Sequence, residues 1–181
     1  MLFTPKSILL KNGQRAVLRS PTPEDAQAML DFLRSTSEET DFLIRYPEEC
    51  LTDMDAEAGF LSDICQSDSN MMILCEIDGN IVGNCHLWYT PRIKLRHRGK
   101  VAIALLQRFW GLGLGTAMFE ELIVLARSMN LEQLELTYID GNNRARKLYE
   151  KMGFCEVAQI PNAYHLKDGS VRSDIWMIKK L

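Results

Sequence analysis

Short apolar blocks alternate with polar turn sequences along the chain. Blocks that are rich in β-branched and aromatic residues predict strands over residues 8–10, 15–19, 71–77, 81–89, 95–106, 131–139, 154–166 and 171–179. Turn sequences join three pairs of these strands into hairpins, at Asn12-Gly13, at Asp78-Gly79-Asn80 and at residues 167–170.

Helical spacing predicts four further segments. Thr22-Pro23-Glu24-Asp25 combines a hydroxyl cap, a proline at the first helical position and two acids that favour a helix start, so a helix is expected from there to Arg34. The other three helices are predicted at residues 52–67, 116–129 and 142–152, the last one stopped by Gly153. Antiparallel hairpins therefore surround one strand–helix–strand crossover, which puts two parallel strands in the middle of the sheet.

Composition and charge narrow the class of protein. The chain has 181 residues, 46% of them hydrophobic and 25% charged, which predicts a single globular domain over residues 1–181. Its net charge of −3 argues against nucleic acid as a main partner. No secretion signal and no apolar run of about 18 residues is present, so we expect a cytoplasmic protein without a membrane partner.

The five cysteines predict no metal site. They are an odd number, and no two of them form a C-x-x-C pair. We expect reduced, partly buried thiols that fill space in the core, with a catalytic cysteine as the minority interpretation.

A glycine-rich segment is the most informative feature. The apolar residues 101–106 are followed by Gly111, Gly113 and Gly115, and then by a predicted helix. Glycines let the backbone approach a ligand closely, and the free N–H groups at a helix start bind phosphate. A plain glycine-rich turn is the alternative. The segment lacks the lysine of a Walker loop and the spacing of a dinucleotide-binding fingerprint.

A second group of residues lies in the following helix. Asn142, Arg146 and Tyr149 recur at a spacing that places them on one helical face. Asn142 fits a helix cap, which is compatible with ligand contact. Tyr149 could equally be a buried aromatic residue of the core.

Together the two segments resemble the GNAT family of N-acetyltransferases. Residues 134–154 are similar to the second cofactor motif of that family, and residues 17–26 and 167–181 are similar to the two ends of its bacterial members. The resemblance implies a mixed α/β fold with a mostly antiparallel sheet of about seven strands, a central splayed parallel pair and about four helices. It implies an acyltransferase that moves an acetyl group from acetyl-CoA to a primary amine of a small molecule or protein, by direct attack in a ternary complex and without a metal.

The resemblance also implies roles for individual residues. The backbone at Leu105 and Leu106 would pair with the pantetheine arm and supply an oxyanion donor, and Asn142 would contact pantetheine. Tyr149 would protonate the leaving thiolate. The amides around the glycines would hold the pyrophosphate, from Trp110, Gly111, Leu112, Gly113, Leu114, Gly115 and Thr116.

One position departs from the family pattern. Trp110 stands where the family often has Gln or Arg, so a polar contact is missing. A replacement could come from one of four nearby cations, Arg108, Arg144, Arg146 or Lys147.

The general base and the acceptor are less defined. Glu76 and His97 are the candidate bases, with His86 and a water chain as alternatives. The acidic residues 35–41 favour a cationic acceptor, whereas the basic residues 92–100 favour an anionic one or the 3′-phosphate of the cofactor. A catalytically weak acyl-CoA-binding regulator and a nucleotide-binding module are the competing functions. Edge-strand reasoning predicts a homodimer through the C-terminal hairpin.

Overall fold

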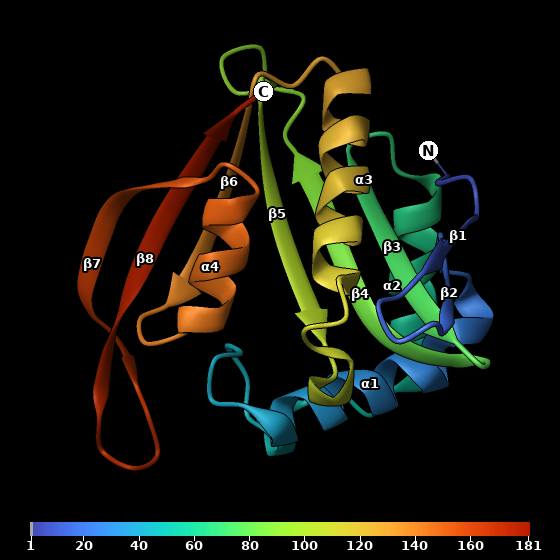
Figure 1. Cartoon of the computed structure of the whole chain (residues 1–181), viewed down its shortest axis with the longest axis horizontal. Helices are drawn as coiled ribbons and strands as arrows, with labels where there is room; N and C mark the ends of the chain where they lie inside the picture. The colour runs from blue at the N-terminus through green and yellow to red at the C-terminus, as the bar shows by residue number, and fades with distance from the viewer. Residues whose placement is uncertain (1) are drawn as a thin grey trace.

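Eight strands form one sheet in the computed structural model, which describes residues 2–181 (Figure 1). The order across the sheet is β1-β2-β3-β4-β5-β6-β8-β7, and only the β5–β6 pair is parallel. The strands are β1 Lys6–Leu9, β2 Arg15–Arg19, β3 Asn70–Ile77, β4 Asn80–Tyr89, β5 Arg98–Leu105, β6 Gln133–Ile139, β7 Cys155–His165 and β8 Val171–Lys180.

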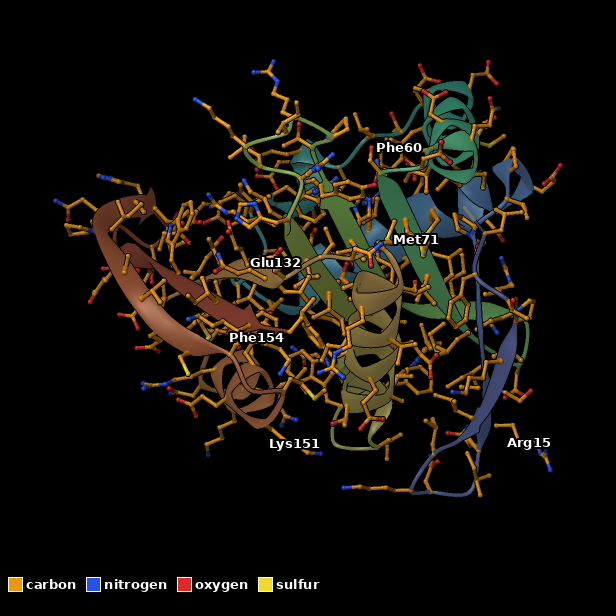
Figure 2. The ribbon with its side chains drawn as sticks, turned by 90° about the horizontal axis from the view of Figure 1, so that it is seen from above. Arg15, Phe60, Met71, Glu132, Lys151 and Phe154 are labelled. Carbon is orange, nitrogen blue, oxygen red and sulfur yellow. The ribbon has the colours of Figure 1, made fainter. Side chains whose placement is uncertain are left out.

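Helices cover both faces of this sheet. They are α1 Ala26–Glu39, α2 Met54–Gln66, α3 Leu114–Ser128 and α4 Asn143–Lys151, with short 3-10 turns η1 Pro23–Asp25, η2 Pro47–Glu49 and η3 Gln107–Phe109. The view from above in Figure 2 places Phe60 of α2 and Lys151 of α4 on opposite sides of the sheet. Within residues 2–181, no helix has the length and apolar character needed to cross a membrane.

The sequence-based fold class is confirmed, including the central parallel pair, although the sheet has eight strands rather than about seven. The prediction of one strand over residues 95–106 was wrong at its start, because β5 begins at Arg98. The preceding residues form a helical turn, in which the N–H groups of Leu95 and Arg96 donate to the carbonyl of Arg92. That turn provides the reversal that antiparallel β4 and β5 require.

The first helix extends five residues beyond its predicted end at Arg34. Thr36 and Ser37 are buried in this extension, and their hydroxyls find partners by donating to carbonyls one turn earlier, at Phe32 and Leu33. The helix therefore ends at Glu39, beside the end of β5.

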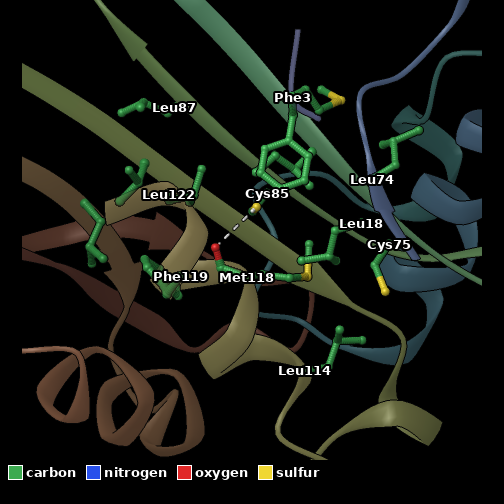
Figure 3. Close-up of a cluster of buried hydrophobic side chains, with 14 of the residues drawn as sticks. Phe3, Leu18, Leu74, Cys75, Cys85, Leu87, Leu114, Met118, Phe119 and Leu122 are labelled. Carbon is green, nitrogen blue, oxygen red and sulfur yellow. Dashed lines mark hydrogen bonds between the residues drawn. The ribbon is translucent and has the colours of Figure 1, made fainter. Parts of the chain in front are cut away.

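One part of the core lies between the sheet and α3, and buried residues of α1 and α2 fill the other face. Figure 3 shows Met118, Phe119 and Leu122 of α3 beneath the sheet, and all three side chains are fully buried. Cys75 and Cys85 are also fully buried there, and burial raises the pKa of the Cys75 thiol to about 12. These two cysteines therefore act as the small apolar fillers that the sequence predicts.

The parallel pair is short. β5 and β6 pair only where Arg98, Gly99 and Lys100 lie beside residues 133–135. Arg98 donates from Nη2 to the buried carboxylate of Glu135 at 2.8 Å, which joins the two strands at this end. Beyond these residues the strands separate, and the space between them opens toward the carboxyl end of β5.

β7 forms one edge of the sheet. All but one of its residues are exposed, and two irregularities interrupt its pairing with β8. The homodimer through this hairpin stays a prediction, as does the single-domain organisation of residues 1–181.

Phe119→Ala tests the contribution of the α3 core. Phe119 is fully buried and contacts the rings of Tyr149 and Phe154 edge-on. We expect the free energy of unfolding to fall by about 3–5 kcal/mol in urea denaturation, because a large cavity forms. Val124→Ala on the same helix is the control, since Val124 is 62% exposed, and its effect should stay within about 0.5 kcal/mol. Equal effects of the two substitutions would contradict this assignment of the core.

Candidate active site

A cleft of about 990 Å³ opens where β5 and β6 separate. Its walls are residues 101–105 of β5, Thr137–Ile139 of β6, the first turns of α3 and α4, the end of α1 and the loop that follows α1. The cleft therefore reaches from the face covered by α3 and α4 to the α1 side of the sheet (Figure 1).

Backbone groups of β5 face this cleft. Leu106 donates its N–H to the carbonyl of Val82, which fixes the pairing between β4 and β5. Because hydrogen bonds alternate along an antiparallel strand, the N–H and carbonyl groups of Ile103 and Leu105 point to the other side, toward the cleft. The N–H of Leu106 is thus used within the sheet, whereas that of Leu105 is directed at the cleft.

The facing wall follows the same rule. Asp140 donates its N–H to the carbonyl of Ser173 in β8. Because the direction of these groups alternates along the strand, the backbone groups of Thr137 and Ile139 point away from β8, toward the cleft. Main-chain donors and acceptors on both walls suit a linear ligand that carries amide groups of its own.

The glycine loop lies at the carboxyl end of β5. Gly111 and Gly113 have φ values of +78° and +92°, a backbone conformation that other residues rarely adopt. The first helical bond of α3 runs from the Ala117 N–H to the carbonyl of Gly113. Within residues 2–181, the N–H groups of residues 111–116 have no hydrogen-bond partner. This row of free donors at a helix N-terminus is suited to a phosphate or pyrophosphate group.

Cations surround this loop. Lys11, Arg144, Lys147 and Lys151 line the cleft, and the Lys151 Nζ donates to the hydroxyl of Thr116 at 3.1 Å. No local pattern points to Lys11, which the β1–β2 hairpin brings to the loop and whose N–H donates to the Leu112 carbonyl.

The structure separates the four cations that the sequence offered as replacements at Trp110. Arg144 and Lys147 line the cleft, whereas Arg108 lies over the ring of its neighbour Phe109. Arg146 pairs with Glu150 at 2.9 Å and with Glu156 at 3.2 Å, outside the cleft lining. Arg144 and Lys147 are therefore better placed than Arg146 to meet an anion.

Trp110 spans the end of the cleft. Its indole Nε1–H donates to the carbonyl of Leu105 at 2.9 Å. The guanidinium of Arg144 lies over the indole ring, 4.8 Å from its centre. The residue that departs from the family pattern thus satisfies one carbonyl of β5 and positions a cation from α4.

Of the other loop residues in the predicted cofactor set, Gly111, Gly113, Gly115 and Thr116 line the cleft together with Trp110 and Leu105. The side chains of Leu106 and Leu114 are buried in the core instead, and Leu112 packs against that core. Only the backbone N–H groups of Leu112 and Leu114 are available to a ligand.

Tyr149 projects from α4 into the wall of the cleft. Its ring packs edge-on against Phe119 at 5.6 Å and lies 5.9 Å from the ring of Tyr138. Among the residues described, none is hydrogen-bonded to its hydroxyl, and burial raises its pKa to about 12. Tyr149 is therefore neutral and protonated at pH 7. Its ring belongs to the core and its residue lines the cleft, and its role as a proton donor stays a prediction.

Asn142 also has two roles. Its side-chain oxygen accepts the N–H of Ala145 at 3.1 Å and so caps α4. The residue lines the cleft as well, which leaves its amide NH₂ group available to a ligand.

The candidate bases are not brought to the cleft. Glu76 accepts a hydrogen bond from Arg19 at 2.9 Å, in a cluster with Asp25. His97 lies in the turn before β5, at the far end of that strand from the glycine loop. His86 is bonded to Asn70, and burial lowers its pKa to about 4. None of the three lines the cleft, because strand pairing directs them elsewhere.

The other half of the cleft is mainly apolar. The loop after α1 contributes Phe42, Leu43 and Ile44, and the sheet contributes Tyr138 and Tyr164. The hydroxyl of Tyr138 donates to Glu156 at 2.6 Å and that of Tyr164 to Asp174 at 3.1 Å. The sequence missed these residues, since nothing local marks a loop as the wall of a distant cleft. Among residues 2–181 there is no cluster of His, Cys, Asp or Glu that could hold a metal.

Comparisons with known proteins agree with this geometry. The family model described as "Acetyltransferase (GNAT) family" matches residues 31–154. The L-amino acid N-acetyltransferase AaaT of Escherichia coli (strain K12) is 27% identical over 109 residues, which are 60% of this chain and 66% of that protein. The match thus spans just under two thirds of the relative's length.

Two solved structures are similar over most of the chain. An acetyltransferase of the GNAT family from Streptococcus pneumoniae is 28% identical, covers 92% of this chain and 99% of its own, and superimposes with a TM-score of 0.86. The putative acetyltransferase yncA from Salmonella typhimurium, solved with its cofactor acetyl-CoA, is 18% identical over 92% and 94% of the two chains, with a TM-score of 0.78.

Gly113→Val tests the glycine loop. A β-branched residue at φ +92° is strained by about 1–2 kcal/mol and disturbs the row of free N–H groups, so we expect the variant to fold but to lose acetyl-CoA binding in calorimetry. Gly169→Val is the matched control, because Gly169 has φ +83° in the β7–β8 turn, with nothing near its missing side chain. Retained binding in the Gly113 variant would show that the phosphate site lies elsewhere.

Proposed function

The chain belongs to the GNAT acetyltransferase family and is an acyl-CoA N-acetyltransferase, and we propose that it moves the acetyl group of acetyl-CoA to the primary amine of a small molecule or protein. The observation that carries this proposal is the cleft between β5 and β6, which has free main-chain N–H groups at one end and Tyr149 in its wall. The amine and its thioester partner would meet within this single cleft, in a ternary complex.

The half of the cleft beside the glycine loop, here called the cofactor half, would bind acetyl-CoA through main-chain groups and cationic side chains. The N–H groups of residues 111–116 would hold the pyrophosphate, with Arg144, Lys147 and Lys11 compensating its charge. The backbone of Ile103 and the carbonyl of Leu105 would pair with the amides of pantetheine, and Asn142 would contact the same arm. Since Trp110 occupies the Leu105 carbonyl, pantetheine would either displace the indole or bond the neighbouring groups.

The chemistry requires three events. The amine loses a proton, its nitrogen attacks the carbonyl carbon of the thioester, and the carbon–sulfur bond breaks. The N–H of Leu105 would stabilise the oxyanion, in place of that of Leu106, which is bonded to Val82. Tyr149 would protonate the departing sulfur. Because Glu76 and His97 do not line the cleft, we propose that water carries the first proton away.

Thermal denaturation with acetyl-CoA, CoA, ATP and NAD in parallel tests the cofactor. A ligand at about 100 times its dissociation constant stabilises the folded state by about 2.7 kcal/mol. For a chain of this size we expect a rise in Tm of about 5–10 °C with acetyl-CoA and CoA only. A rise with ATP or NAD alone would instead support a nucleotide-binding module.

Tyr149→Phe tests the proton donor. We expect kcat to fall by about 100-fold or more, with little change in the acetyl-CoA dissociation constant, because only the hydroxyl is removed. Since the pKa of Tyr149 is about 12, the residue stays protonated at pH 7 and at pH 9, and the loss should be equal at both. Tyr89→Phe, outside the cleft, is the control. Unchanged turnover in the Tyr149 variant would remove this residue from the mechanism, and binding without turnover in the wild type would favour the regulator.

A further inference from the structure

One carboxylate lines the mainly apolar half of the cleft, formed by the loop after α1 with Tyr138 and Tyr164, which is called the acceptor half below. Glu39 is the last residue of α1, and its side chain faces the cleft beside Thr36 and Thr40. Among the described residues of the lining, Glu120 is the only other carboxylate, and it belongs to α3 on the side of the glycine loop. Any positive charge that enters from the α1 side therefore meets Glu39.

The position of Glu39 is fixed by two contacts with Gln107. One carboxylate oxygen, Oε2, accepts the Gln107 N–H at 2.6 Å, and the Glu39 carbonyl accepts the side-chain amide of Gln107. Gln107 is two residues beyond the end of β5, and the backbone of that strand faces the cleft. The second carboxylate oxygen, Oε1, has no hydrogen-bond partner among residues 2–181, so it remains free to accept one.

The charge of Glu39 has no structural compensation. A helix carries partial negative charge at its carboxyl end, so an acid there is unfavourable. The neighbouring Glu38 is paired with Arg34 at 3.1 Å, whereas no cation is paired with Glu39 in the part of the chain that the structure describes. The Gln107 contact holds one carboxylate oxygen in place but brings no positive charge, and a cationic ligand at the second oxygen would supply it.

The side chains around Glu39 indicate the polarity of the rest of the ligand. Phe42, Leu43 and Ile44 line the cleft next to it, and Ile44 is 81% exposed. Tyr138 and Tyr164 face them from the sheet, with their hydroxyls bonded to Glu156 and Asp174. The acceptor half thus offers one anionic group and an apolar, aromatic wall.

We propose that Glu39 binds the ammonium group of the acceptor, and that the acceptor is a primary amine with one positive charge on an apolar or aromatic group. This inference rests on the proposed function and defines its substrate class. A polyamine fits poorly, because its further ammonium groups would meet apolar side chains or the cations of the other half. Glu39 is then an acceptor-binding residue, and it acts before the amine is deprotonated.

Steady-state kinetics with acetyl-CoA and three probe amines tests the substrate class. We expect kcat/KM for phenethylamine to exceed that for ethanolamine and for spermidine by at least about tenfold, because only phenethylamine fills the apolar wall with a single charge. A preference for spermidine or ethanolamine would overturn the inference.

Glu39→Gln tests the residue. The amide oxygen still accepts the Gln107 N–H, so the variant removes the charge and keeps the loop contact. We expect KM for phenethylamine to rise by about 10–100-fold, with a smaller change in kcat and an unchanged dissociation constant for acetyl-CoA. Glu38→Gln is the matched control, since Glu38 ends the same helix but does not line the cleft, and its kinetics should equal those of the wild type.

The outcomes separate the two proposals. If the wild type acetylates phenethylamine and Glu39→Gln does so with the same KM, the role of Glu39 is overturned and the proposed function stands. If the wild type binds acetyl-CoA but acetylates none of the three amines, the substrate class is overturned. If it does not bind acetyl-CoA, the proposed function fails and this inference fails with it.

Discussion

The site exists because β5 and β6 stop forming hydrogen bonds with each other partway along their length. The two parallel strands pair only over residues 98–100 and 133–135, where Arg98 and Glu135 join them. Past that point the N–H groups of Ile103, Leu105 and Ile139 point into the gap, whereas the carbonyls of Leu105 and Ile139 accept from Trp110 and Asn142. Backbone polar groups require partners, so a wedge of this kind is stable only if solvent or a ligand supplies them. The first turns of α3 and α4, the glycine loop and the loop after α1 all line the gap between β5 and β6.

Local patterns were sufficient to predict the parts of the fold that depend on neighbouring residues. The hairpin at Asn12-Gly13, the capping role of Asn142, the glycine loop and the single crossover all follow from residues close together in sequence. The helix end at Glu39 did not follow, because the polar residues Thr36 and Ser37 are buried by tertiary packing and satisfy their hydroxyls on the helix backbone.

Contacts between distant segments decided the rest of the site. Glu76 could be placed on a central strand but not assigned a partner, and its pairing with Arg19 depends on the β2–β3 register. Lys11 and Glu39 reach the cleft from hairpin and helix ends that only the folded sheet brings together. For the same reason the sequence could name four cations near the loop but could not select Arg144 and Lys147 among them.

The part of the cleft formed by β5 and the glycine loop offers mainly main-chain groups, and this has an evolutionary consequence. An N–H or a carbonyl is the same whichever side chain the residue carries, so substitutions along β5 and through the loop change the recognition groups very little. What selection must preserve is the path of the backbone, together with the left-handed conformation at Gly111 and Gly113. Chains that share few residues can thus keep one way of holding a common ligand.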